Sequence, residues 1–335
     1  MDKFDFAVGN CPYQIMSTNK TFYPPIYHSF MDAVYEFSNS SILITPARFL
    51  FNAGKTPETW NNKMLNDKHF KVLHYEESSE NFFSNTKIKG GIAITYRNDN
   101  KEFIPIRVFV PYKELQSILK KVENKTSLTT IIYGKNKWNL EQLYTDYPEI
   151  SKNIANNGKA KSLESNSFSK ISIFTDLVEK DGFKIYGVLN NKRCFKYIPK
   201  KYIDTNHDNL YKYKVLVPEC NGSGAFGEVL SHPFVCKPLV GYTRTFIGIG
   251  SFDTENEAEN CLKYIKSKFC RACLGILKIT QHSAIKTWLY VPLQDFSNNS
   301  DIDWSKSNID RQLYKKYNLT NEEIDFIETH VKEMK

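Results

Sequence analysis

The first third of the chain alternates β-rich runs with segments of helical spacing. Strands are expected at four runs rich in apolar and β-branched residues: FDFAVGN (4–10), SSILITP (40–46), FKVLHYEE (70–77) and KGGIAITYRN (89–98). Each run is bounded by Gly, Pro, Asn or acidic residues, which favour turns. The first of them leads directly into the turn-forming stretch GNCPYQ (9–14).

Two helices are expected between these strands. The segment PPIYHSFMDAVYEF (24–37) begins with prolines and then repeats apolar residues at helical spacing, at Ile26, Phe30, Val34 and Phe37. The segment TPETWNNKMLND (56–67) reads as a helix capped by Thr56, with Pro57 in its first turn. Strands that alternate with helices predict an α/β fold with a mainly parallel sheet. Ligands of such sheets lie beyond the carboxyl ends of the strands, where GNCPYQ is placed.

The residue composition of the sequence changes after Val110. Residues 113–218 are rich in Lys and Asn and contain short strand-like runs, namely KIYGVLNN (184–191), RCFKYIP (193–199) and YKVLVPE (213–219). The polar stretch 153–161 predicts a loop.

A second α/β segment follows. The capping box Thr254-Glu255-Asn256-Glu257 opens an expected helix whose apolar face is formed by Ala258, Leu262, Ile265, Phe269 and Leu274. A last helix is expected after a similar start at residues 320–323.

The charge of the chain is concentrated in its middle. The 335 residues carry a formal net charge of +8, and residues 113–218 alone hold 19 Lys and Arg against 11 Asp and Glu. Such a cluster is either a solvated face or a surface that binds a polyanion, because clustered cations displace counterions from phosphates.

The remaining composition bears on the compartment. No run of about 18 apolar residues is present, and no cleavable leader is recognised at MDKFDFAVGN. Seven cysteines without a regular spacing indicate reduced thiols, so a cytoplasmic protein without membrane segments is expected.

The stretch Asn10-Cys11-Pro12-Tyr13 carries the most specific chemistry. An enzyme that methylates the exocyclic amine of adenine must draw both N–H bonds toward acceptors and hold the base out of the duplex. The Asn10 side-chain oxygen and the Cys11 carbonyl would accept the two N–H groups, and Pro12 would fix the turn. Tyr13 would stack on the flipped base.

With its flanks, this stretch resembles a known family. FAVGNCPYQ, IYHSFMDAVYEF, ILITPARFLFNAGK, WNNKMLNDKHFKVL and TKIKGGIAITY follow one another as in the adenine-specific DNA methyltransferases of bacterial restriction–modification systems, above all those that combine restriction and methylation in one polypeptide. Later stretches resemble their target-recognition region, namely YKVLVPECNGSGAFGEVL, TFIGIGSFDTENEAENCLKYIKSKF, VPLQDF and DIDWSKS.

The resemblance implies a partial Rossmann-like methyltransferase domain followed by an α/β target-recognition domain. Residues 1–112 would be the catalytic, target-base half, 113–300 would recognise double-stranded DNA, and 301–335 would be a C-terminal helical segment. The methyl donor would be S-adenosylmethionine.

The sequence departs from the family at two points. The family has Pro where Cys11 stands, which keeps the carbonyl but loses a rigid φ. The Gly-rich turn that holds the cofactor is not found upstream of Asn10, so the cofactor-binding residues are unknown. We therefore expect a C-terminal part of the enzyme, with the cofactor half on a separate subunit or lost. The alternative is a DNA-binding specificity module, or relic, without catalysis.

The glycine-rich stretch VLVPECNGSGAFGEVL (215–230) allows three interpretations. A kinase loop lacks its later catalytic motifs here. A circularly permuted cofactor turn should open a helix and be followed by an acidic residue, but prolines follow and residues 237–251 hold no acid. The family comparison favours the third, a recognition-domain loop in which Gly222 and Gly224 let the backbone approach DNA.

The best candidates for further DNA contacts lie in one basic run with interleaved aromatic residues. They are Lys192, Arg193, Lys196, Lys200 and Lys201, beside Phe195, Tyr197 and Tyr202. A solvated strand face is the alternative. Cys270 and Cys273 read as ordinary helix cysteines, because a zinc site needs four ligands. His28 reads as structural, Arg48 as either a phosphate contact or a surface residue, and no metal site is expected.

Overall fold

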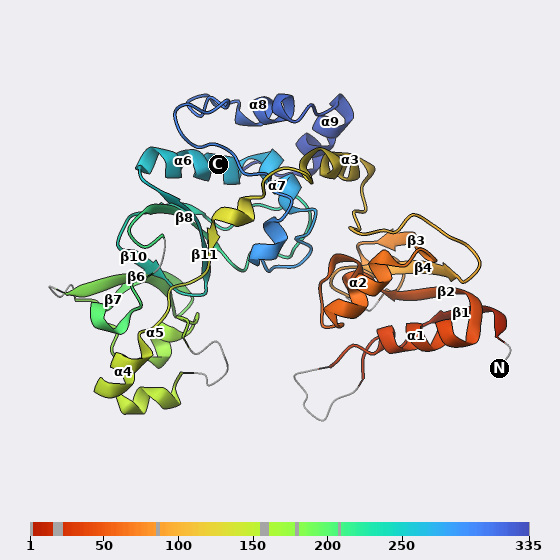
Figure 1. Cartoon of the computed structure of the whole chain (residues 1–335), viewed down its shortest axis with the longest axis horizontal. Coiled ribbons are helices and arrows are strands. Elements are labelled where there is room, and N and C mark those ends of the chain that lie inside the picture. The colour runs from red at the N-terminus through yellow and green to blue at the C-terminus, as the bar shows by residue number, and fades with distance from the viewer. Residues whose placement is uncertain are drawn as a thin grey trace. The chain divides into compact units, whose positions relative to one another are not determined.

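The computed structural model describes residues 3–15, 23–84, 88–154, 161–177, 181–206 and 209–334. The chain divides into two compact units, Met1–Lys113 and Glu114–Lys335 (Figure 1). Both are mixed α/β, which confirms the expected fold class. Within the described ranges, every helix is too short or too polar to cross a membrane.

The first unit is built on a four-stranded sheet. Its strands are β1 (Phe4–Asn10), β2 (Ser38–Pro46), β3 (Phe70–Glu76) and β4 (Ile92–Asn98), in the order β1-β2-β4-β3. All four strands were expected from the sequence. Only β1 and β2 are parallel, whereas β4 runs antiparallel to both β2 and β3.

The expectation of a mainly parallel sheet is therefore wrong. A parallel neighbour needs a long crossover, usually through an α-helix, and α1 (Tyr27–Phe37) provides one between β1 and β2. The described part of the connection from β3 to β4 contains the short 3₁₀ helix η2 (Ser79–Asn81) and no α-helix. The chain therefore returns beside β3 in the opposite direction.

The core of the first unit contains aromatic rings from α1, from the 3₁₀ helix η1 (Ala47–Phe51) and from α2 (Glu58–Asn66). The ring of Phe49 lies 5.3 Å from that of Trp60 and 6.2 Å from that of Phe70. The expected cap of α2 is wrong in one respect. Pro57 occupies the N-cap position, and the Thr56 hydroxyl donates instead to the Asn61 side chain at 2.7 Å.

The second unit holds two further sheets. One contains β5 (Ile132–Tyr133), β8 (Tyr213–Pro218), β9 (Phe234–Cys236) and β11 (Phe246–Phe252), all antiparallel in the order β5-β11-β8-β9. The other has the order β10-β6-β7 and contains β6 (Gly182–Leu189), β7 (Lys192–Pro199) and β10 (Val240–Tyr242). The strand-like runs of residues 184–219 are thus confirmed.

Some helices of the second unit pack on these sheets and others on one another. The helices are α3 (Lys113–Val122), α4 (Leu140–Asp146), α5 (Ser167–Lys170), α6 (Glu255–Lys266), α7 (Lys268–Leu274), α8 (Ile309–Lys316) and α9 (Asn321–His330). Helix α6 packs on β8, β9 and β11 and α5 packs on β6, whereas α8 and α9 pack on α7. Single 3₁₀ turns lie at η3 (Leu128–Ile131), η4 (Pro148–Lys152), η5 (Lys200–Tyr202) and η6 (Ile285–Trp288). Most of the loop expected at 153–161 lies outside the described residues.

Both expected capping boxes are present. Thr254 caps α6 and Thr320 caps α9. In each box the threonine side chain accepts from the backbone N–H of the glutamate three residues on, and the carboxylate of that glutamate accepts from the threonine N–H. The single helix expected from Thr254 to Leu274 is wrong, because the chain leaves helical geometry at Ser267. The Ser267 side chain accepts from the Cys270 N–H and so starts a new helix, α7.

Candidate functional site

The Asn10–Tyr13 turn lies at the carboxyl end of an edge strand. Asn10 is the last residue of β1 and faces Ile44 of β2 in the parallel register. The Cys11 N–H then donates to the Ile44 carbonyl at 3.2 Å, which fixes the start of the turn against the sheet. The Asn10 side chain is exposed and Cys11 is buried.

The rest of the turn is held by the segment that leads into α1. The Ile26 N–H donates to the Tyr13 carbonyl at 3.2 Å, and the Ile15 N–H donates to the Pro24 carbonyl at 3.1 Å. Two short chain segments are thus paired side by side directly after β1. These two bonds therefore hold the main chain of the turn at Tyr13 and at Ile15.

The electrostatics of the turn keep its side chains neutral. Burial raises the pKa of the Cys11 thiol to about 11, so the thiol is protonated at neutral pH. Burial, followed by the nearby Cys11 thiol, also raises the pKa of Tyr13, while the Asn10 side chain partly offsets the rise. The Tyr13 hydroxyl is buried and has no partner of normal hydrogen-bond geometry among the described residues.

This geometry provides acceptors without a general base. No described residue donates a hydrogen bond to the Cys11 carbonyl, and the Asn10 amide faces solvent. Among the described residues, neither oxygen has a hydrogen-bond donor, so both suit an amine with two N–H groups. The roles given to Asn10, Cys11, Pro12 and Tyr13 remain predictions.

Two neighbours of the turn have structural partners. The ring of His28 lies 5.6 Å from that of Trp60 and 6.2 Å from that of Tyr27, within the aromatic core. The Arg48 guanidinium donates to the Lys89 carbonyl and so ties η1 to the start of β4.

The basic run expected to contact DNA lies on β7 and η5 of the second unit. The structure divides its five cations into two kinds. Lys196 pairs with Asp176 and Lys201 with Asp146, at 2.7 and 2.6 Å. The Arg193 guanidinium donates to the carbonyls of residues 231 and 232. Lys192 and Lys200 are exposed and form no ion pair within the described ranges, so they are the most available to a polyanion.

Aromatic rings accompany these cations on one face of β6 and β7. Tyr186 lies opposite Phe195 in the register, and their ring centroids are 4.6 Å apart. The Lys184 ammonium lies 4.1 Å from the centre of the Phe195 ring. Phe195 is 37% exposed, whereas Tyr202 is buried and donates its hydroxyl to Asp146. The Lys201 ammonium lies 4.9 Å from the centre of the Tyr202 ring. Cations and rings therefore meet at both Phe195 and Tyr202, but only Phe195 is exposed.

The glycine-rich loop is closed by its own acidic residue. The Glu228 carboxylate accepts from the N–H groups of Ser223 and Gly224 at 2.9 and 3.1 Å, and from the Lys278 ammonium at 2.6 Å. Gly224 and Gly227 have positive φ angles. A Cβ atom at either would lie within about 2.4 Å of backbone atoms of the same unit.

This arrangement does not fit a cofactor. The N–H groups that would cradle an anion already bind Glu228, and the chain continues into a loop and then β9 rather than into a helix. The same close contacts explain structurally why glycine stands at these positions. That Gly222 and Gly224 contact DNA stays a prediction.

The arrangement of possible metal ligands can be judged only for the described residues. Among the residues that the structure describes, no three His, Cys, Asp or Glu side chains gather in a way that could hold a metal ion. Cys270 and Cys273 are fully buried in α7, and burial raises the pKa of both thiols.

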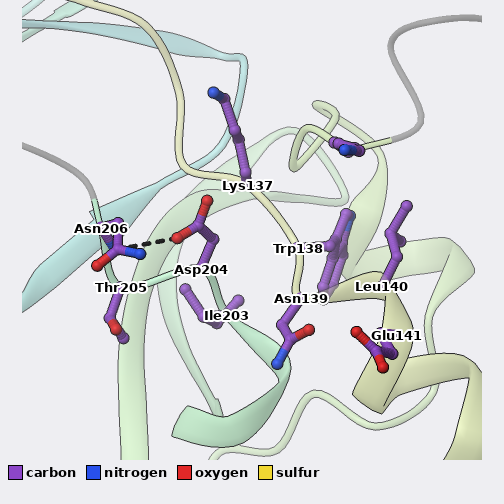
Figure 2. Close-up of a pocket in the computed structure, with 10 residues that line it drawn as sticks. Lys137, Trp138, Asn139, Leu140, Glu141, Ile203, Asp204, Thr205 and Asn206 are labelled. Carbon is purple, nitrogen blue, oxygen red and sulfur yellow. Dashed lines mark hydrogen bonds between the residues drawn. The ribbon is translucent and has the colours of Figure 1, made fainter.

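A cavity of about 450 Å³ was not anticipated from the sequence. It lies in the second unit between residues 137–141 and 203–206, with Lys161 beside them (Figure 2). Its lining is polar and carries both signs of charge. The only sequence signal was the general Lys and Asn richness of this region, which does not single out these positions.

The comparison with known families bears on the first unit. A β-strand that ends in Asn-x-Pro-Tyr and continues through α1 into a parallel strand is the arrangement described above for residues 4–46. Residues 1–83 match the model of the family described as Eco57I restriction-modification methylase. The chain thus resembles restriction–modification methylases over this stretch. No curated protein matches the chain.

Proposed function

We propose that the chain is part of an adenine-specific DNA methyltransferase of a restriction–modification system. The family match points to a methyltransferase, and the observation that carries the finer proposal is the Asn10–Tyr13 turn at the end of β1. Its two oxygens, on the Asn10 side chain and the Cys11 main chain, accept no hydrogen bond from a described residue and suit an amine that must direct both N–H bonds to acceptors.

The turn would hold a base that has left the duplex. Asn10 and Cys11 would orient the amine so that its lone pair leaves conjugation with the ring. Tyr13 would stack on the base, with its main chain fixed by Ile26. S-adenosylmethionine would supply the methyl group when bound. The Gly222–Gly227 loop does not fit this cofactor, so no step is assigned to it.

A cofactor-binding half, on the same polypeptide or on a separate subunit, would complete the site, and the edge of β1 offers a place for it. Within the described ranges, β1 pairs only with β2. Phe4, Phe6 and Val8 point to one side of this edge strand and are 70, 50 and 74% exposed. An edge with unpaired main-chain groups and apolar side chains favours pairing with another strand. A strand added there would end next to Asn10.

The second unit would bind double-stranded DNA. Its support is the positive excess of residues 113–218 and the exposure of Lys192 and Lys200. If catalysis is absent, the same surface would serve a specificity module, which is the alternative function.

The test is methyl transfer to duplex DNA by the chain together with the product of an adjacent reading frame that carries the Gly-rich cofactor motif. Asn10→Ala should abolish transfer and leave DNA binding unchanged. Asn100→Ala is the matched control, because Asn100 is an exposed asparagine of the same unit away from the turn. Transfer that survives in Asn10→Ala would refute the role of Asn10. Binding without any transfer by the wild-type pair would favour the specificity module.

A further inference from the structure

The cavity of the second unit is framed by main-chain hydrogen bonds. The Trp138 N–H donates to the Lys161 carbonyl at 2.6 Å, the Asn139 N–H to the Tyr202 carbonyl at 2.9 Å, and the Asp204 N–H to the Lys137 carbonyl at 3.0 Å. Three segments distant in sequence are thus held side by side. Trp138 and Ile203 are only 4 and 3% exposed, so they close the floor. The cavity is a fixed feature of the fold rather than a gap between loose loops.

Some side chains around this floor bind main-chain groups of the unit, and others make no hydrogen bond to a described residue. Asn139 donates its amide to the Lys201 carbonyl at 3.0 Å. Asp204 accepts from the Asn206 N–H at 3.0 Å, which is the dashed line in Figure 2. The side chains of Glu141 and Asn206 are exposed and make no hydrogen bond to any described residue. Figure 2 shows them on opposite sides of the cavity.

Two lysines stand at the same cavity. Lys137 and Lys161 both line it, both are exposed, and neither forms an ion pair within the described ranges. Lys200 and Lys201, of the basic run, precede Ile203 by three and two residues, respectively. The cavity therefore opens beside the cations already proposed to meet DNA.

We propose that this cavity faces the major groove of a bound duplex, and that the exposed side chains of Glu141 and Asn206 contact there the exocyclic amine of a cytosine or an adenine and determine the preference for its base pair. This inference rests on the proposed function, because it assigns the sequence-reading residues of the same enzyme. Lys137 and Lys161 hold the flanking phosphates.

The charges decide between a base edge and a phosphate as the occupant. Two carboxylates, of Glu141 and Asp204, line the cavity and would repel a phosphate inside it. Carboxylates accept hydrogen bonds from the cytosine amine, and an asparagine amide pairs with adenine. Lysines at the rim suit phosphates, which fix register but carry no sequence information. The volume of about 450 Å³ lies in the range of ordinary ligand sites, ~300–1,000 Å³.

The experiment is selection of bound duplexes from a library with randomised positions, followed by affinity measurements at several salt concentrations. The wild-type chain should prefer one base pair, in one orientation, at one position at least. Glu141→Gln or Asn206→Ala should reduce that discrimination by roughly 5- to 150-fold and leave the salt slope unchanged. Lys137→Ala and Lys161→Ala should each lower the slope by about 1 and leave the selected sequence unchanged.

The matched controls are Glu149→Gln, Asn299→Ala and Lys286→Ala, which alter exposed residues of the same unit outside the cavity. The inference is overturned if Glu141→Gln and Asn206→Ala select the same sequences as the wild type with the same discrimination. It is also overturned if tight binding of a free nucleotide, rather than DNA, is what these variants lose. A wild-type chain that binds no DNA would overturn the DNA-binding part of the proposed function as well, so the two failures are distinguishable.

Discussion

The carboxylate of Glu228 and the ammonium of Lys278 lie 2.6 Å apart, with side chains that are only 15 and 4% exposed. Burial raises the pKa of Glu228, but the Lys278 contact and the N–H groups of Ser223 and Gly224 outweigh it. The pKa of Glu228 therefore lies below its ordinary value of 4.5. The pair fills the space that a bound anion would need in the glycine-rich loop.

This pair predicts a pH-dependent contribution to stability. A carboxyl group with a lowered folded pKa stabilises the fold fully above the unfolded value of 4.5, and the contribution is lost as pH falls through the lower folded value. Glu228→Gln should lower the free energy of unfolding at pH 7 by about 1–3 kcal/mol, because it leaves the Lys278 ammonium buried without its partner. Urea unfolding followed by circular dichroism measures this. The difference from the wild type should shrink below about pH 4; an equal difference at pH 7 and pH 3.5 would contradict the assignment.

The two neighbouring lysines of η5 should contribute unequally to DNA binding. Lys200 has no ion pair among the described residues, whereas Asp146 holds Lys201 and raises its pKa. Lys200→Ala should therefore lower the salt slope of DNA binding by about 1, and Lys201→Ala by less. Fluorescence anisotropy at several salt concentrations measures both, with Lys286→Ala as the control. A larger effect at Lys201 would show that its ion pair opens on binding.

The ring of Tyr13, and not its hydroxyl, should matter for methylation. The hydroxyl is buried without a normal hydrogen bond to any described residue, so Tyr13→Phe should leave kcat/KM close to that of the wild type. Tyr13→Ala removes the stacking face, which is worth about 1–3 kcal/mol for a base, or a loss of roughly 5- to 150-fold in kcat/KM. Methyl transfer by the complete enzyme gives the readout. Equal losses in both variants would assign the role to the hydroxyl instead.

The edge of β1 should govern assembly. Val8 is 74% exposed on this edge, so Val8→Asp should leave the fold of the first unit intact and block association with a strand-bearing partner. Ile104→Asp is the control, because Ile104 is 92% exposed but lies outside the sheet. Analytical ultracentrifugation of the chain with the co-expressed cofactor subunit distinguishes the two variants. A complex that forms equally well with Val8→Asp would place the partner elsewhere.

Local patterns predicted local structure well. The strand ending at Asn10 and the capping boxes at Thr254 and Thr320 depend on neighbouring residues, and all three are present. The break at Ser267 had a local signal, since serine is a strong cap, but the apolar face that continues to Leu274 obscured it. The direction of β4 had no such signal, because it depends on how the connection folds back.

The same contrast between local and tertiary features holds for the candidate site. The order of Asn10 and Tyr13 along the chain was enough to place a candidate turn at the end of β1, but its chemistry stays a prediction. The ion pair of Lys196 with Asp176 was not foreseeable, because it joins residues 20 apart through tertiary structure. The cavity floor at Trp138 and Ile203 was hidden for the same reason, since its two sides are 65 positions apart in the sequence.

The ion pair between Lys121 of α3 and Glu323 of α9 joins positions 202 residues apart, and the Lys332 N–H donates to the Gly227 carbonyl. The second unit is thus fastened by its own first and last helices. During synthesis at ~5–20 residues per second, α3 must wait on the order of 10–40 s for this partner to emerge. The first unit, whose sheet is formed within residues 4–98, has no such delay. Nascent chains of this protein should therefore pass through a stage with one finished unit and one open unit, in which a chaperone has its opportunity to bind.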